Sequence, residues 1–127
     1  MLLDTSVLIR HLTGEPSDQA ERATRRLATE PELVLTDVVL AECAHVLRSN
    51  YGLARSEVSL LLRSAMGLPS VVTRDKDLLD LTFFLYERTA VDFPDAYVAA
   101  VAARSGADRV LSFDRDFDRL PGERVEP

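Results

Sequence analysis

Residues 1–12, MLLDTSVLIRHL, set the pattern on which the fold prediction rests. An apolar triplet precedes Asp4, and either Thr5 or Ser6 can cap a helix that follows at once. This order predicts a short strand at residues 1–3, an acid at its carboxyl end, and then a short helix.

The same alternation of short apolar runs and helical segments continues along the chain. Strands are expected at 32–35, 71–72 and 110–112, with a marginal one near Val125, and helices at 17–29, 38–49, 55–66, 75–88 and 94–105. Strands that alternate with helices predict a three-layer α/β/α sandwich with a short-stranded, mainly parallel central sheet. Because no repeat or linker interrupts the pattern, we expect residues 1–127 to form a single domain.

Composition narrows the class of protein. The 127 residues are 46% hydrophobic and 28% charged, which is typical of a globular chain. No apolar run approaches the roughly 20 residues that span a bilayer, and the N-terminus lacks the features of a signal peptide. A cytoplasmic protein without a membrane segment is therefore expected. Cys43 is the only cysteine, which excludes an internal disulfide and a thiolate zinc site.

A net charge of −6 argues at first against a nucleic-acid partner. If four of the 21 acids form one metal site, the charge of the remainder rises from −6 to −2. Two divalent cations in that site would cancel the four charges. The acidic composition is thus compatible with a metal-using nuclease, and it favours a basic protein partner.

Two acids follow predicted strands. Asp4 follows the first strand, and Asp114 stands two residues beyond the 110–112 strand, so both are expected at the carboxyl edge of the sheet, where α/β proteins bind ligands. The alternative for each is helix capping or turn formation. For Asp4 the neighbouring hydroxyl residues favour the functional interpretation, because they already supply a cap. For Asp114 a close competitor is Asp116.

Glu42 and Asp95 lie on predicted helices. Glu42 shares a helix side with Val38 and Val46, and a lone acid there is costly to bury unless it is paired or bound to a cation. A salt bridge with Arg48 is the alternative. Asp95 lies in the first turn of an alanine-rich helix that can approach the sheet closely, which aims its carboxylate into the crevice.

Asp92, three residues before Asp95, is interpreted as the cap of the same helix, although it stays a second candidate for the site. Four acids that converge on one crevice repel one another unless cations neutralise them. Carboxylate oxygens without cysteine or histidine favour Mg²⁺ or Mn²⁺, as one or two ions. Such ions activate water for the hydrolysis of a phosphodiester.

Four segments of the chain together resemble the PIN-domain family, specifically its VapC-type toxin ribonucleases. They are MLLDTSVLI, TDVVLAEC, DFPDAYVAA and RVLSFDRDFDRL, and their order and spacing extend the resemblance over essentially the whole chain. The resemblance implies a PIN-like fold in which four acids, here Asp4, Glu42, Asp95 and Asp114, bind the divalent ion.

The resemblance also assigns supporting roles. Asp116 supports the site, Thr5 or Ser6 hydrogen-bonds the first acid or a metal-bound water, and Ser112 keeps a hydroxyl where the family usually has threonine. The resemblance further implies cleavage of RNA at selected bonds, a homodimer, and inhibition by a cognate VapB-type antitoxin. The protein would be the toxin of a type II toxin–antitoxin pair.

Basic residues give a weaker signal. Arg10 lies two helical turns after Ser6 and is a possible RNA contact near the mouth of the crevice. Arg22, Arg25 and Arg26 share one helix face; a solvated face paired with glutamates is favoured over a grip on RNA phosphates.

Two other functions are alternatives to the ribonuclease. A non-catalytic PIN-like binding module is disfavoured by the presence of all four acids. An aspartate-nucleophile phosphatase or phospho-acceptor is less consistent with the sequence, because position 6 is Ser6 where such a site has a second acid and because the single lysine, Lys76, is misplaced.

Overall fold

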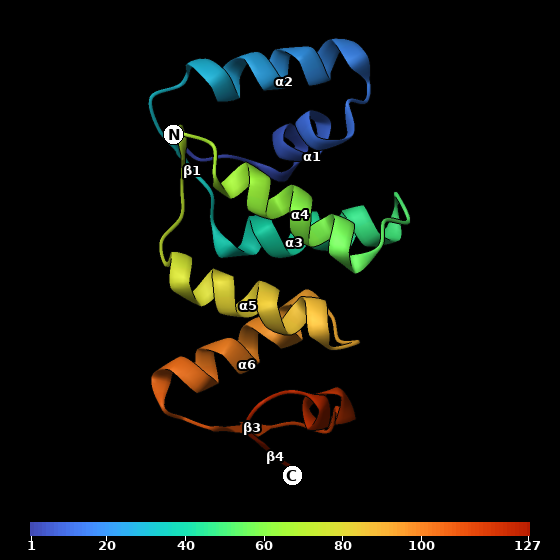
Figure 1. The fold of residues 1–127 in the computed structure, drawn as a ribbon, viewed down its shortest axis with the longest axis vertical. Helices are drawn as coiled ribbons and strands as arrows, with labels where there is room; N and C mark the ends of the chain where they lie inside the picture. Colours follow the sequence, from blue (N-terminus) through green and yellow to red (C-terminus); the bar gives the residue numbers. More distant parts are fainter. The chain divides into compact units, whose positions relative to one another are not determined.

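The computed structural model describes residues 1–127 as two compact units, Met1–Arg74 and Asp75–Pro127. The first unit contains helices α1 (Thr5–Thr13), α2 (Ser17–Thr29), α3 (Asp37–Ser49) and α4 (Arg55–Met66) with strands β1 (Leu33–Val34) and β2 (Val71–Val72) (Figure 1). The second contains α5 (Lys76–Arg88), α6 (Phe93–Ser105), β3 (Arg109–Leu111), the 3₁₀ helix η1 (Arg115–Arg119) and β4 (Glu123–Val125).

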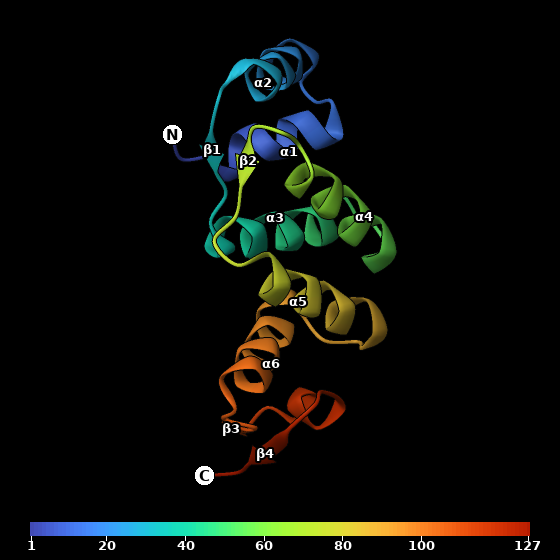
Figure 2. The same cartoon turned by 60° about the vertical axis from the view of Figure 1, so that its left-hand side comes forward.

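All strand pairs are parallel, as predicted. In the first unit β1 pairs with β2, and Figure 2 shows the two strands side by side. In the second unit β3 pairs with β4, which confirms the marginal strand expected near Val125. Parallel pairs joined through helices are the pattern of α/β proteins. None of the helices is long and apolar enough to cross a membrane.

The prediction of a strand over residues 1–3 is only partly correct. Only one isolated parallel bridge forms there, between Leu2 and Val34. The Leu3 amide donates to the Val34 carbonyl at 2.9 Å, and the Val34 amide donates to the Met1 carbonyl at 2.7 Å. Asp4 already caps α1, which begins at Thr5, so the segment is too short to form a ladder of strand hydrogen bonds. The bridge still places Asp4 directly beyond β1.

The core of the first unit lies along one side of α3. The fully buried side chains there are those of Leu40, Cys43, Ala44 and Leu47. Full burial of an aliphatic side chain contributes roughly 1.5–3 kcal/mol. Cys43 is therefore a core residue.

The core of the second unit joins aromatic rings to an alanine-rich helix. The Phe93 ring packs edge-on against Phe83 and Tyr86, with centroid separations of 5.2 and 5.8 Å. On α6 the side chains of Ala96, Ala99 and Ala100 are fully buried, so this helix packs closely against its neighbours.

Gly122 leads the chain into β4 with a φ of 96°. A Cβ there would stand 2.7 Å from the Asp108 carbonyl oxygen, which accepts a hydrogen bond from the Glu123 amide. Only glycine permits this approach, so the pairing of β3 with β4 depends on it.

Candidate functional site

Asp4 is the N-cap of α1. Its Oδ2 accepts hydrogen bonds from the Ser6 amide at 3.1 Å and from the Ser6 hydroxyl at 2.7 Å. The prediction that Thr5 or Ser6 caps this helix is therefore wrong, because aspartate caps as well as serine and stands at the residue where the extended chain ends. The Ser6 hydroxyl, followed by the Ser6 amide, lowers the pKa of Asp4. Asp4 is thus an exposed and oriented carboxylate.

Thr5 links the first turn of α1 to α3. Its side chain is buried, and its hydroxyl donates to Oε2 of Glu42 at 2.8 Å. The two hydroxyls that follow Asp4 therefore hold two different carboxylates, Ser6 the one at Asp4 and Thr5 the one at Glu42. The alternative partner of Glu42, Arg48, instead donates to the Leu53 carbonyl at 2.8 Å.

Glu42 does not lie on a buried stripe of α3, which corrects the sequence-based expectation. Val38, one turn before it, is 76% exposed, and Glu42 is exposed as well. Periodicity shows which residues share a side of a helix, but it does not show which side meets the core when apolar residues lie on both. Glu42 is held by a hydroxyl donor and needs no buried charge partner.

The thiol next to Glu42 is inert. Burial raises the pKa of Cys43 to about 12, with a smaller contribution from the charges of Glu42 and Asp4 and an opposing hydrogen bond from Thr5. A thiol with so high a pKa stays protonated at neutral pH and is a poor nucleophile. Cys43 is therefore a structural residue of the core.

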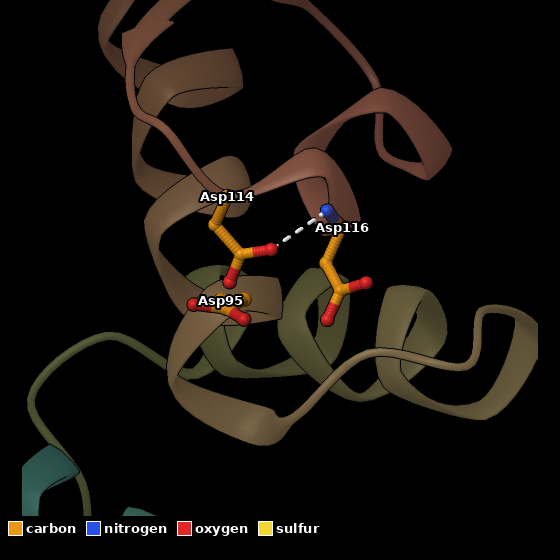
Figure 3. A group of neighbouring side chains, drawn as sticks. All are labelled: Asp95, Asp114 and Asp116. Atoms are coloured by element: carbon orange, nitrogen blue, oxygen red, sulfur yellow. Dashed lines mark hydrogen bonds between the residues drawn. The ribbon is translucent and has the colours of Figure 1, made fainter.

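In the second unit, Asp95, Asp114 and Asp116 gather into one cluster. A carboxylate oxygen of each lies within 4.8 Å of the others (Figure 3). Asp95 projects from α6, and the other two project toward it from the segment after β3. The structure thus brings together two predicted catalytic acids and the predicted supporting acid.

Asp95 is carried by the first turn of α6. Asp95 is the third residue of α6, as predicted, and Pro94 before it is compatible with a first turn. Asp92 occupies the N-cap position, but its carboxylate makes no capping hydrogen bond. The position predicted for Asp92 is confirmed, and the side-chain cap is not.

A network of hydrogen bonds holds the segment that carries Asp114. The Ser112 hydroxyl accepts from the Asp114 amide at 2.9 Å, and Oδ1 of Asp114 accepts from the Asp116 amide at 2.9 Å, which caps η1. Ser112 therefore supports the site through the backbone of Asp114.

Arg124 is a supporting residue that the sequence analysis missed. Its side chain is only 12% exposed and donates to the Ser112 carbonyl at 3.0 Å and to Asp118 Oδ1 at 2.8 Å. Nothing in the local sequence indicates that an arginine at position 124 stabilises a turn that lies twelve residues earlier. The spacing becomes meaningful only when β4 pairs with β3.

The carboxylates of the cluster repel one another. Burial raises the pKa of Asp95, and the charges of Asp114, Asp92 and Asp116 raise it further. Oxygen donors within 4.8 Å of one another can share a single ion, and carboxylates without nitrogen or sulfur ligands suit Mg²⁺ or Mn²⁺. The residues present therefore fit a hard divalent cation.

Comparison with known proteins places the chain in a family. The PIN domain family matches residues 1–123, and the chain belongs to that family. A VapC ribonuclease of Aquifex aeolicus is 26% identical over 129 residues, covering 99% of this chain and 96% of that protein.

Among solved structures, Mycobacterium tuberculosis VapC20, described as a sarcin-ricin loop cleaving toxin, is similar at a TM-score of 0.44 and 23% identity. The similarity covers 92% of each chain. The predicted resemblance to the PIN-domain family is confirmed by the family match, and so is the predicted PIN-like α/β/α fold class with short parallel strands.

Proposed function

We propose that the protein is a metal-dependent endoribonuclease that hydrolyses RNA phosphodiester bonds. The observation that carries the proposal is the cluster of Asp95, Asp114 and Asp116, which fits a divalent cation in a chain of the PIN domain family. The named activity of the Aquifex aeolicus relative, a ribonuclease aligned over 99% of this chain, supports RNA as the substrate.

The catalytic residues of the proposal are Asp4, Glu42, Asp95 and Asp114. We propose that residues 1–127 form a single PIN domain whose acids serve one reaction, and the family match over residues 1–123 supports this. Asp4 and Asp95 would bind Mg²⁺, or Mn²⁺ as a substitute, directly. Glu42 and Asp114 would act directly or through water, with one or two ions in the site.

The bound cation supplies positive charge that activates a water and stabilises the developing charge on the phosphate. In the hydrolysis the water oxygen bonds to phosphorus, the bond to one ribose oxygen breaks, and the proton lost by water balances the one gained by the leaving oxygen. Asp4, with its lowered pKa, is a weak base, so it suits a role as a ligand and an orienting acceptor. Ser6 fixes its carboxylate and Thr5 fixes that of Glu42.

The proposal extends to the partners of the protein. We propose that it is a toxin of a type II toxin–antitoxin pair, that it forms a homodimer in the cytoplasm, and that a VapB-type antitoxin inhibits it. The similarity to a VapC ribonuclease supports these assignments. The net charge of −6 favours a basic antitoxin segment.

The test is cleavage of total cellular RNA by the purified protein, with sequencing of the new RNA ends. Cleavage is expected with Mg²⁺ or Mn²⁺ and should stop with a chelator. Asp4→Asn and Asp95→Asn should each lose at least about a hundredfold in rate. Asparagine keeps the cap of α1, so unfolding does not explain a loss in Asp4→Asn.

Asp77→Asn is the matched control, because Asp77 also lies in the first turn of a helix but outside the cluster. It should cleave as the parent does. Cleavage at the parental rate by Asp4→Asn and Asp95→Asn would overturn the proposal.

A further inference from the structure

A cleft of about 650 Å³ opens in the first unit beside Asp4. It is lined by α1, α2 and the first residues of the chain. Its charged lining consists of four arginines, Arg10, Arg22, Arg25 and Arg26, and two acids, Asp4 and Glu30. In a protein with a net charge of −6, this local excess of cations is distinctive.

Arg10 is fixed in place next to the proposed catalytic acid. Its Nη1 donates to the Ser6 carbonyl at 3.0 Å, and its Nε donates to Oε1 of Gln19 on α2. Ser6 in turn hydrogen-bonds Asp4. The guanidinium is therefore oriented before any ligand arrives, which reduces the entropy lost on binding.

The arginines of α2 differ in their partners. Arg25 pairs with Glu21 at 2.7 Å, and Arg26 pairs with Glu30, as predicted for a solvated face. Arg22, one turn beyond Gln19, is exposed, lines the cleft and makes no ion pair in the structure. Its charge is thus available to an anion.

We propose that this cleft holds the phosphate backbone of the RNA strand next to Asp4, with Arg10 and Arg22 contacting phosphates. The inference rests on the proposed function, since it names how the substrate of that site is held. Guanidinium groups match phosphate oxygens in a bidentate geometry. The cleft begins at Asp4, a proposed catalytic acid, so the RNA substrate has to lie beside it. An acidic peptide is the alternative occupant, but it is not a substrate and has no such requirement.

The experiment measures RNA binding separately from cleavage. The full chain carrying Asp95→Asn, which prevents cleavage, is titrated against a fluorescein-labelled 20-nucleotide RNA of random sequence in Mg²⁺, and anisotropy is followed at several salt concentrations. Adding Arg22→Gln should raise Kd about threefold to tenfold and lower the slope of log K against log salt by about 1. Arg22 makes no internal ion pair, so its loss should not disturb the fold.

Two further variants sharpen the result. Glu21→Gln releases Arg25 from its ion pair and should lower Kd, an effect that a damaged protein cannot imitate. Arg48→Gln removes an arginine of the same unit that does not line the cleft and should leave Kd unchanged. Equal Kd and salt slope with and without Arg22→Gln, or no RNA binding by the titrated protein, would overturn the proposal. Displacement of the RNA by polyglutamate at the same affinity would also overturn it, in favour of an acidic protein partner.

Cleavage kinetics separate this proposal from the proposed function. In the otherwise native chain, Arg22→Gln should raise KM and leave kcat unchanged, which is the effect of lost substrate binding. If Asp95→Asn cleaves at the parental rate while Arg22→Gln has a raised KM, the cleft holds RNA but the proposed catalytic site is incorrect. A lost rate in Asp95→Asn with an unchanged KM in Arg22→Gln means the reverse.

Discussion

The two units of the chain hold their carboxylates in opposite ways. In Met1–Arg74, Asp4 and Glu42 each accept a hydrogen bond from a neutral hydroxyl, those of Ser6 and Thr5. In Asp75–Pro127, three aspartates lie within 4.8 Å of one another. The pKa of Asp4 is accordingly lowered by donors, whereas the pKa of Asp95 is raised by burial and by neighbouring acids.

The first unit orients its carboxylates with hydrogen-bond donors, whereas the second unit holds carboxylates of like charge close together. A hydroxyl donor orients each carboxylate of the first unit, and at Asp4 the donors also favour the charged form. The carboxylates around Asp95 lie among like charges, which a bound cation would neutralise. The response of the protein to divalent ions should therefore depend on the cluster.

The largest expected effect is the stabilisation of the folded protein by Mg²⁺ or Mn²⁺. An ion at a hundred times its Kd raises the free energy of unfolding by about 2.7 kcal/mol. Thermal unfolding with and without the ion should show a clear rise in Tm for the parent and for Asp77→Asn, and little rise for Asp95→Asn. An equal rise in Asp95→Asn would mean that the ion binds elsewhere.

A smaller effect is expected from the hydroxyl that holds Glu42. Thr5→Val keeps the shape of the side chain but removes the donor to Glu42, which should lower the free energy of unfolding by about 1 kcal/mol. The rate of RNA cleavage should fall about tenfold, as expected when an outer-shell partner is lost. Thr5→Ser keeps the hydroxyl and is the control for both urea unfolding and cleavage. If Thr5→Val and Thr5→Ser behave alike, the hydrogen bond does not matter.

The smallest effect is on the cation-free cluster itself. In a chelator, Asp95→Asn should be slightly more stable than the parent, because it removes one of the mutually repelling charges. The gain should stay below about 1 kcal/mol, since water and salt screen a partly exposed group. Asp4→Asn, whose carboxylate has donors rather than like charges around it, should gain nothing. Urea unfolding of the three proteins tests this, and a clear loss of stability in Asp95→Asn would contradict the repulsion described for the cluster.

The sequence predicted most of the helices and the parallel strands because apolar periodicity, glycines and prolines are local signals. The start of α6 is an example: Pro94 and the alanines placed Asp95 in its first turn, where the structure has it. The association of Asp95 with Asp114 also followed from local order, because an acid after a parallel strand lies at a known edge of the sheet.

The errors arose where several residues compete for one role. Asp4, Thr5 and Ser6 can all cap a helix, and the sequence does not show which one the chain leaves extended. For α3, apolar residues such as Val38 lie outside the core, so the buried face was assigned to the wrong side. The bracing role of Arg124 depends on the pairing of β3 with β4, which only the folded chain reveals.

The central proposal is that Asp4, Glu42, Asp95 and Asp114 serve one metal-dependent reaction. Its most direct test is the affinity for Mn²⁺, measured by isothermal titration calorimetry on the parent, Asp4→Asn and Asp95→Asn. We expect Asp4→Asn, although Asp4 is not a member of the cluster of Asp95, Asp114 and Asp116, to weaken Mn²⁺ binding at least about tenfold. Parental affinity in Asp4→Asn, with binding lost in Asp95→Asn, would contradict it.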